Sequence, residues 1–175
     1  KLRLLGITGT NGKTTTAHMT REVLKQAGLR CGLLGTVQND LCGRSVTAEM
    51  TTPGPLALAA MLRECADAGA AAAVLEVSSH ALDQKRTDGL RFSAAAFTNL
   101  TQDHLDYHQT MEQYADAKAR LFEGLDREAV AIVNVDDAAH SRMLRDCPAK
   151  VVTYGLSRDA DLRATITRDS VGGTF

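Results

Sequence analysis

Apolar positions along this chain alternate between two spacings, one typical of buried strands and the other typical of helices. Residues 2–8 form a short apolar run that ends in a glycine-rich turn, and Met19, Val23 and Ala27 then recur at helical spacing within residues 14–27. The same alternation predicts strands at residues 29–36, 72–77, 92–98, 129–135 and 151–154, and helices around residues 58–65, 111–122 and 137–144. Strands that alternate with helices imply right-handed crossovers, so the predicted fold class is α/β: a doubly wound, mostly parallel sheet flanked by helices.

Two segments depart from this alternation. Turn residues at positions 39–40 and 43–44 predict an irregular, polar excursion after the second strand. Residues 161–175 alternate with period two and contain Gly172-Gly173, which predicts a terminal antiparallel hairpin. Because we find no internal repeat and no low-complexity linker, we expect residues 1–175 to form a single domain.

Composition narrows the function classes. The 175 residues fit one domain that buries roughly 70% of its unfolded surface. Lys+Arg is 20 and Asp+Glu is 21, so the net charge of −1 argues against binding to nucleic acid or a membrane surface through bulk charge. No apolar run approaches the roughly 20 residues needed to span a bilayer. The four cysteines are far apart, without a Cys-x-x-Cys pair, which favours reduced thiols and a cytoplasmic location.

A glycine-rich loop joins the first predicted strand to the first predicted helix. It reads GITGTNGKTTT over residues 6–16. Its glycines allow backbone N–H groups to surround phosphate oxygens, Lys13 can reach the β- and γ-phosphates, and the Thr14 hydroxyl can hold Mg²⁺. The general P-loop pattern has a glycine where this chain has Ile7, and Gly9 is used instead. We therefore predict a variant P-loop that binds a nucleoside triphosphate through Gly9, Thr10, Asn11, Gly12, Lys13, Thr14 and Thr15.

A carboxylate follows the buried strand at residues 72–77. Ligands of parallel sheets bind outside the carboxyl ends of the strands, so Glu76 is placed to hold Mg²⁺ beside the phosphate loop. An alternative is that Glu76 caps the helix that follows.

Two histidines, His104 and His108, lie in a polar loop that opens on the same sheet edge. Their spacing fits a zinc pair, a solvated loop or a Mg²⁺-linked site, and residue types alone leave these three open.

Lys118 shares one helical face with Tyr114, Leu121 and Phe122, which places an amine on an apolar stripe. Either the side chain snorkels to solvent, or it is kept in the site and chemically altered.

Together these motifs resemble the Mur ligases, the ATP-dependent amide-bond synthetases of peptidoglycan precursor assembly. The resemblance is strongest to the MurE type, which adds the third amino acid to UDP-N-acetylmuramoyl-L-alanyl-D-glutamate. It spans nearly the whole chain and is carried by residues 9–15 (GTNGKTT), 50–53 (MTTP), 76–82 (EVSSHAL), 98–108 (TNLTQDHLDYH) and 114–118 (YADAK).

The resemblance implies a role for each matching residue. Lys13 and Thr14 would bind ATP phosphates and Mg²⁺, Glu76 and His104 would bind a second Mg²⁺, and Asn134 would lie near the nucleoside. Lys118 would carry CO₂ as a carbamate that helps hold the metal. Contacts to the UDP-N-acetylmuramoyl dipeptide are implied for Thr51, Thr52, Ser78, Gln84 and Arg86. The catalytic set implied is thus Lys13, Lys118, Glu76 and His104.

The same resemblance implies neighbours that this length cannot hold: an N-terminal uridine-binding domain and a C-terminal domain that binds the amino acid. We therefore expect the chain to be a central ATP-binding domain, inactive as a ligase alone, and monomeric. Gln84 and Arg86 resemble the diaminopimelate-type enzymes, which implies meso-diaminopimelate rather than L-lysine as the added amino acid. The rival interpretations are a folylpolyglutamate or cyanophycin synthetase, and a non-catalytic P-loop nucleotide-binding module.

Overall fold

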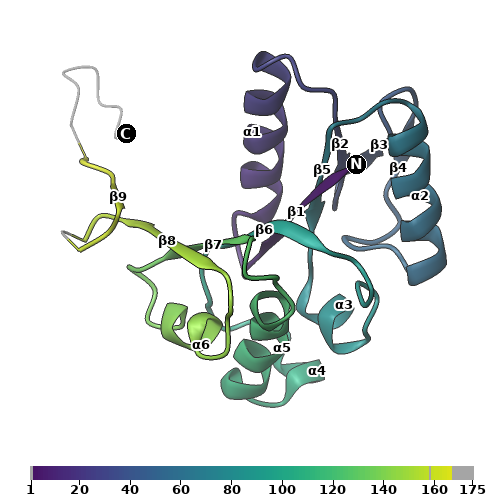
Figure 1. The fold of residues 1–175 in the computed structure, drawn as a ribbon. Helices are drawn as coiled ribbons and strands as arrows, with labels where there is room; N and C mark the ends of the chain where they lie inside the picture. The colour runs from purple at the N-terminus through teal and green to yellow at the C-terminus, as the bar shows by residue number, and fades with distance from the viewer. Residues whose placement is uncertain (1, 158, 167–175) are drawn as a thin grey trace, which may run out of the picture.

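In the part of the chain that the structure describes, nine strands form a mostly parallel sheet at the centre of the molecule (Figure 1). The structure is a computed structural model that describes residues 2–157 and 159–166. The strand order is β4-β3-β2-β5-β1-β6-β7-β8-β9, and all neighbours pair in parallel except β2–β3 and β3–β4. The strands are β1 (Arg3–Thr8), β2 (Cys31–Leu34), β3 (Gln38–Asp40), β4 (Ser45–Thr47), β5 (Ala72–Glu76), β6 (Phe92–Phe97), β7 (Val130–Asn134), β8 (Lys150–Gly155) and β9 (Leu162–Arg163). The predicted fold class is confirmed.

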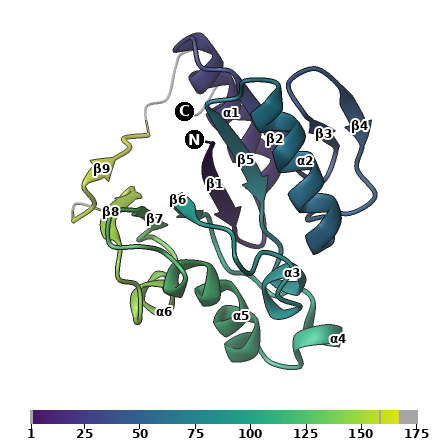
Figure 2. The same cartoon turned by 45° about the vertical axis from the view of Figure 1, so that its right-hand side comes forward.

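Six helices connect the described strands and cover both faces of the sheet. They are α1 (Lys13–Gln26), α2 (Pro55–Asp67), α3 (Ser79–Asp83), α4 (Leu105–His108), α5 (Met111–Glu123) and α6 (His140–Leu144). Side chains of α2, α3, α5 and α6 join one hydrophobic core, whereas α1 packs against a smaller cluster on the opposite face (Figure 2). No helix among the described residues is both long and apolar enough to cross a bilayer.

The buried side chains show which face of each predicted helix and strand packs against the core. The stripe on α2 is buried at Leu58, Leu62 and Cys65, and β5 is buried along its whole length. The helix predicted at residues 14–27 is confirmed as α1, although Met19 and Val23, whose spacing predicted it, are 65% and 67% exposed. Ala17 is the buried residue of this helix, and its small side chain lets α1 approach the sheet closely.

The polar excursion predicted after β2 is also a wrong prediction. It forms the antiparallel strands β3 and β4, with the register Gln38 to Thr47 and Asp40 to Ser45. Of the predicted terminal hairpin, the described part forms only the short strand β9, which pairs in parallel with β8. The Gly172-Gly173 turn lies outside the described residues.

The strand register brings the predicted site residues to one edge of the sheet. Ile7 pairs with Glu76, and Thr8 pairs with Phe97, so the carboxyl ends of β5, β1 and β6 are adjacent. The phosphate loop, Glu76 and the loop that contains His104 therefore leave the sheet side by side. In Figures 1 and 2, α3, α4 and α5 gather toward this end, away from the start of the chain.

Candidate active site

The phosphate loop requires glycine at two positions. Gly12 adopts φ +83° and is the N-cap of α1, and no side chain caps the helix there. Gly9 adopts φ +146°, and a Cβ at this residue would lie 1.9 Å from Thr98 Oγ1. Both conformations strain any other residue. The loop and the first turn of α1 border a hollow of about 300 Å³, which is lined by Thr10, Asn11, Gly12, Lys13, Thr14, Thr15, Thr36 and Thr51.

The segment after β6 holds this loop in place. The Thr10 and Asn11 N–H groups donate to the main-chain and side-chain oxygens of Asn99, at 2.8 and 2.9 Å. Thr98 Oγ1 and Asn99 Nδ2 both donate to the Asn11 carbonyl, at 2.7 and 3.1 Å. Asn99 was assigned no role from the sequence, although it lies inside the motif at residues 98–108. It takes part in three of these four hydrogen bonds and holds the loop against the segment after β6.

Two lysines meet at one carbonyl oxygen of the loop. Lys13 Nζ donates to Gly9 O at 2.9 Å and to Thr10 O at 2.8 Å, and Lys118 Nζ donates to Gly9 O at 3.0 Å. Lys118 is only 1% exposed, so the snorkelling alternative is wrong. Burial, and then the nearby Lys13 charge, lowers the pKa of Lys118 to about 7. Near neutral pH a substantial fraction of this amine is therefore uncharged.

Glu76 leaves β5 toward the phosphate loop and is 1% exposed. Its Oε2 accepts hydrogen bonds from Thr14 Oγ1 at 2.8 Å and Thr36 Oγ1 at 2.9 Å, and its Oε1 accepts from the Thr36 N–H at 2.9 Å. The helix-cap alternative is wrong, because Ser78 caps α3 by accepting from the Ala81 N–H. The role of Thr36 was not predicted, because nothing in the sequence indicates that a hydroxyl after β2 donates to Glu76.

Gly35 leaves the space that the Glu76 carboxylate occupies. A Cβ at residue 35 would lie 2.1 Å from Glu76 Oε1. We expect Gly35→Ala to displace this carboxylate, to lower the free energy of unfolding by about 1–3 kcal/mol and to weaken Mg²⁺-dependent nucleotide binding several-fold. Urea unfolding and nucleotide titrations with and without Mg²⁺ would measure both effects. Gly54→Ala is the matched control, because nothing lies within 4 Å of a Cβ at Gly54, and an equal response of the two variants would contradict the expectation.

The donor set at Glu76 fits Mg²⁺. The ion prefers about six oxygen ligands at 2.0–2.1 Å in an octahedron, which puts adjacent ligand oxygens roughly 3 Å apart. Thr14 Oγ1 and Glu76 Oε2 are 2.8 Å apart. Among the described residues, no cluster of three or more His, Cys, Asp or Glu side chains is arranged to hold a metal. Phosphate and water oxygens would therefore have to complete the shell.

The histidines divide between surface and interior. His108 is buried, and its Nε2 lies 2.9 Å from Ser79 Oγ, so it joins α4 to α3. His104 is the N-cap of α4 at φ +53° and lies 3.5 Å from Asp103. Its ring contacts His80 edge-on, with centroids 4.8 Å apart. No hydrogen bond or ion pair joins His104 to Glu76 in the described part of the chain, so its place in a metal site stays a prediction.

The residues expected to contact a substrate lie around the end of β5, near Glu76. Thr52 Oγ1 donates to the Glu76 carbonyl at 2.8 Å and accepts from the Ser78 N–H at 3.0 Å. Arg86 donates to the Thr52 carbonyl at 2.9 Å and to Gln84 Oε1. Thr51 lies 3.1 Å from Thr36, next to the loop. The structure thus brings all five of these residues, Thr51, Thr52, Ser78, Gln84 and Arg86, into one network.

Asn134 ends β7 at the same sheet edge. Its Nδ2 donates to the Thr98 carbonyl at 2.9 Å, and its Oδ1 accepts from the Asp136 N–H at 3.0 Å. The amide thereby links β7 to the segment that clamps the phosphate loop. Its expected position near a nucleoside stays a prediction.

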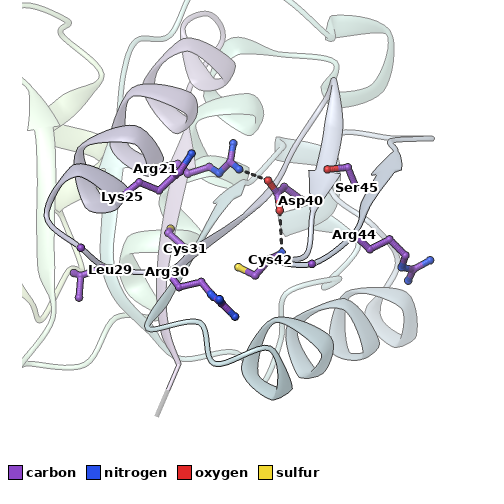
Figure 3. A pocket seen from close by; sticks show the side chains of 11 residues that line it. Arg21, Lys25, Leu29, Arg30, Cys31, Asp40, Cys42, Arg44 and Ser45 are labelled. Atoms are coloured by element: carbon purple, nitrogen blue, oxygen red, sulfur yellow. Dashed lines mark hydrogen bonds and ion pairs between the residues drawn. The ribbon is translucent and has the colours of Figure 1, made fainter.

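Another hollow, of about 540 Å³, lies around the C-terminal half of α1, beside β3 and β4 (Figure 3). It lies at the opposite end of α1 from Lys13, about 18 Å away for twelve residues of helix. Four basic side chains line it, but carboxylates already pair with three of them: Arg21 with Asp40, Arg44 with Glu64, and Lys25 with Glu22. We therefore assign no ligand to this hollow.

Comparisons with known proteins agree with this geometry. A family model described as the Mur ligase middle domain matches residues 7–175. The UDP-N-acetylmuramoyl-L-alanyl-D-glutamate--2,6-diaminopimelate ligase of Geobacter sulfurreducens is 44% identical over 98% of this chain and 36% of that protein. The ligase of the same name from Synechococcus elongatus is 50% identical over 94% of this chain and 33% of that protein. The chain thus spans about a third of the length of these curated relatives.

Solved structures show the same fold. A structure described as UDP-N-acetylmuramoyl-L-alanyl-D-glutamate--2,6-diaminopimelate ligase superposes with a TM-score of 0.83 at 36% identity, over 99% of this chain and 38% of that one. Mycobacterium tuberculosis folylpolyglutamate synthase with ADP superposes with a TM-score of 0.68 at 21% identity, over 99% of this chain and 46% of that one. At that identity the second likeness shows the fold alone.

Proposed function

The chain belongs to the Mur ligase family, and from this premise we propose that it is the central ATP-binding domain of a ligase that extends UDP-N-acetylmuramoyl-L-alanyl-D-glutamate by meso-diaminopimelate. The observation that carries this proposal is the meeting of Lys13, Glu76 and Lys118 around one phosphate loop. The names of the diaminopimelate ligases similar to this chain support the choice of substrate.

Each residue has a role that its position supports. Lys13 and the N–H groups of the loop bind the phosphates and stabilise the charge that develops during phosphoryl transfer. The D-glutamyl carboxylate attacks the γ-phosphorus and ADP leaves, which gives an acyl phosphate. The amine of the incoming amino acid then attacks the acyl carbon, and phosphate leaves. Arg86, which Thr52 helps to hold through its carbonyl, would bind the anionic substrate beside the loop. The attacking group is the substrate's own carboxylate, so no protein nucleophile is needed.

Mg²⁺ bound at two sites would neutralise the triphosphate. Thr14 would hold the first ion, and Glu76, His104 and a carbamylated Lys118 would hold the second. Because Thr14 Oγ1 and Glu76 Oε2 are 2.8 Å apart, the two sites would be adjacent.

Carbamylation of Lys118 is supported by its surroundings. The reaction joins an uncharged amine to CO₂ and releases one proton, and the lowered pKa of Lys118 increases the uncharged fraction. It replaces a buried cation next to Lys13 by an anion that Lys13 and Mg²⁺ would neutralise. Intact-mass measurement in bicarbonate with Mg²⁺ and nucleotide should show one added CO₂. An unchanged mass under these conditions would contradict the carbamate.

Further domains are part of this proposal. The family members similar to this chain are about three times as long, and we propose that the uridine and amino-acid sites lie in those additional parts. We also propose a monomer in the cytoplasm, a compartment that suits four free cysteines.

We expect the isolated chain to form no tripeptide product and the full-length protein that contains it to form product, ADP and phosphate. Mass spectrometry of the product with UDP-N-acetylmuramoyl dipeptide and diaminopimelate tests this, and L-lysine serves as the alternative amino acid. Turnover of folate with glutamate would favour the folylpolyglutamate rival instead. Ligation by the isolated chain at enzyme-like rates would overturn the proposal that the uridine and amino-acid sites lie in further domains.

A further inference from the structure

A chain of hydrogen bonds runs from the expected substrate residues to α5. Arg86 donates to Gln84 Oε1 from Nε at 3.0 Å and Nη2 at 2.6 Å. Gln84 Nε2 lies 3.3 Å from the Tyr107 hydroxyl, which donates to Asp83 Oδ2 at 2.9 Å. Arg120, two residues beyond Lys118, donates to Asp83 Oδ1 at 2.9 Å. The chain therefore connects β5–β6 loop residues with α3, α4 and α5.

The chemistry of the two arginines fixes the direction of every bond in this chain. A guanidinium only donates, so Gln84 must turn its oxygen toward Arg86 and its NH₂ group toward Tyr107. The Tyr107 hydroxyl then accepts a hydrogen bond from Gln84 and donates its only proton to a hydrogen bond with Asp83. The hydrogen bond from Tyr107, followed by Arg120, lowers the pKa of Asp83, which keeps this acceptor charged. Only a side chain that can both accept and donate a hydrogen bond can link the Gln84 NH₂ group to the Asp83 carboxylate.

The ring of Tyr107 makes a separate set of contacts. It lies against His80, with centroids 4.2 Å apart, and against His108 at 4.8 Å. His80 in turn contacts His104, which begins α4 in a left-handed conformation that is costly for a non-glycine residue. The contact between the Tyr107 ring and His80 of α3 therefore helps to hold the short helix that follows His104.

We propose that Tyr107 is a positioning residue that orients Gln84 and Arg86 toward the substrate through its hydroxyl, and that its ring, through His80, supports His104 at the start of α4. This inference rests on the proposed function and adds to it a residue that contacts neither ATP nor the reacting atoms. Tyr107 is 38% exposed, so its role does not depend on filling the core.

The hydroxyl and the ring can be tested separately in the full-length protein. Tyr107→Phe keeps the ring and removes the link between Gln84 and Asp83, so KM for UDP-N-acetylmuramoyl dipeptide should rise about three- to ten-fold, while KM for ATP and the Mg²⁺ dependence stay unchanged. Tyr107→Leu removes the ring contacts as well, so KM for the dipeptide should rise at least as far as in Tyr107→Phe. Ser141→Ala, which removes one exposed hydroxyl bonded to Ala138 O, is the matched control and should change neither constant.

The possible failures are distinguishable. If the unsubstituted protein converts the dipeptide and Tyr107→Phe leaves KM for the dipeptide unchanged, or raises KM for ATP equally, the positioning role is wrong and the proposed function stands. If the unsubstituted protein does not convert the dipeptide, the proposed function is wrong and this inference falls with it. Tyr107→Phe decides the matter even if Tyr107→Leu does not fold.

Discussion

Replacing Glu76 with glutamine is expected to lower ATP-dependent turnover by the full-length protein by about 10²- to 10³-fold, the loss typical of removing one preorganised electrostatic group from an active site. The amide keeps an oxygen that can accept the Thr36 N–H, and the Thr14 and Thr36 hydroxyls can rotate to accept from its NH₂ group. The fold should therefore survive. The substitution removes the negative charge beside the phosphate loop. It therefore replaces a carboxylate oxygen, a strong Mg²⁺ ligand, with a neutral amide group.

A Mg²⁺ titration of turnover, together with urea unfolding, measures this effect. Half-maximal activity should require much more Mg²⁺ in Glu76→Gln, while the free energy of unfolding changes little. Glu64→Gln makes the same substitution on the surface of α2, where the carboxylate pairs with Arg44 in solvent, and should leave turnover unchanged. Turnover of Glu76→Gln within a few-fold of the unsubstituted protein would show that Glu76 holds no metal.

Glu76 also illustrates what the sequence could predict. Its position followed from a general rule, because the carboxyl ends of adjacent parallel strands meet at one edge. The register Ile7 to Glu76 places it beside the phosphate loop as expected. Its partner Thr36 could not be predicted, because the contact depends on how β2 ends and on the space left by Gly35. Motifs therefore located the site, but tertiary contacts decide which hydroxyls and amides complete it.

The same limit applies to the elements. The helix around residues 58–65 was predicted correctly because a helix that packs on a sheet buries one continuous stripe, here Leu58, Leu62 and Cys65. In α1 the spacing of Met19 and Val23 was helical, but periodicity does not reveal which side of a helix meets the sheet, and Ala17 makes that contact. Strands β3 and β4 are three residues long and polar. Too few side chains alternate there for a pattern to emerge.

Replacing Lys118 with methionine is expected to stabilise the chain while it abolishes ligation. In the folded protein the amine is buried, with a pKa of about 7 against 10.5 for the free side chain. Between these values the unfolded state binds more protons than the folded state, so the stability of the unsubstituted chain rises with pH. Methionine fills a similar volume without a charge. Its advantage should be largest below pH 7 and should shrink by about 1.4 kcal/mol for each pH unit above it.

Urea unfolding of both chains from pH 6 to 9, without bicarbonate or metal, tests this difference. Burial raises the pKa of Cys31 to about 11 and of Cys65 to about 12, so these thiols oppose the trend above pH 9. They occur in both chains, and subtraction removes their effect. Lys150→Met makes the same substitution at an exposed position of β8 and is the matched control. If the Lys118→Met advantage is absent at pH 6, or constant across the range, the buried amine is charged and stably accommodated, and the structure gives it no reason to react with CO₂. If the advantage follows the predicted slope, Lys118 destabilises the folded chain. Its presence at this buried position is then explained by a chemical role in the site and not by a contribution to stability.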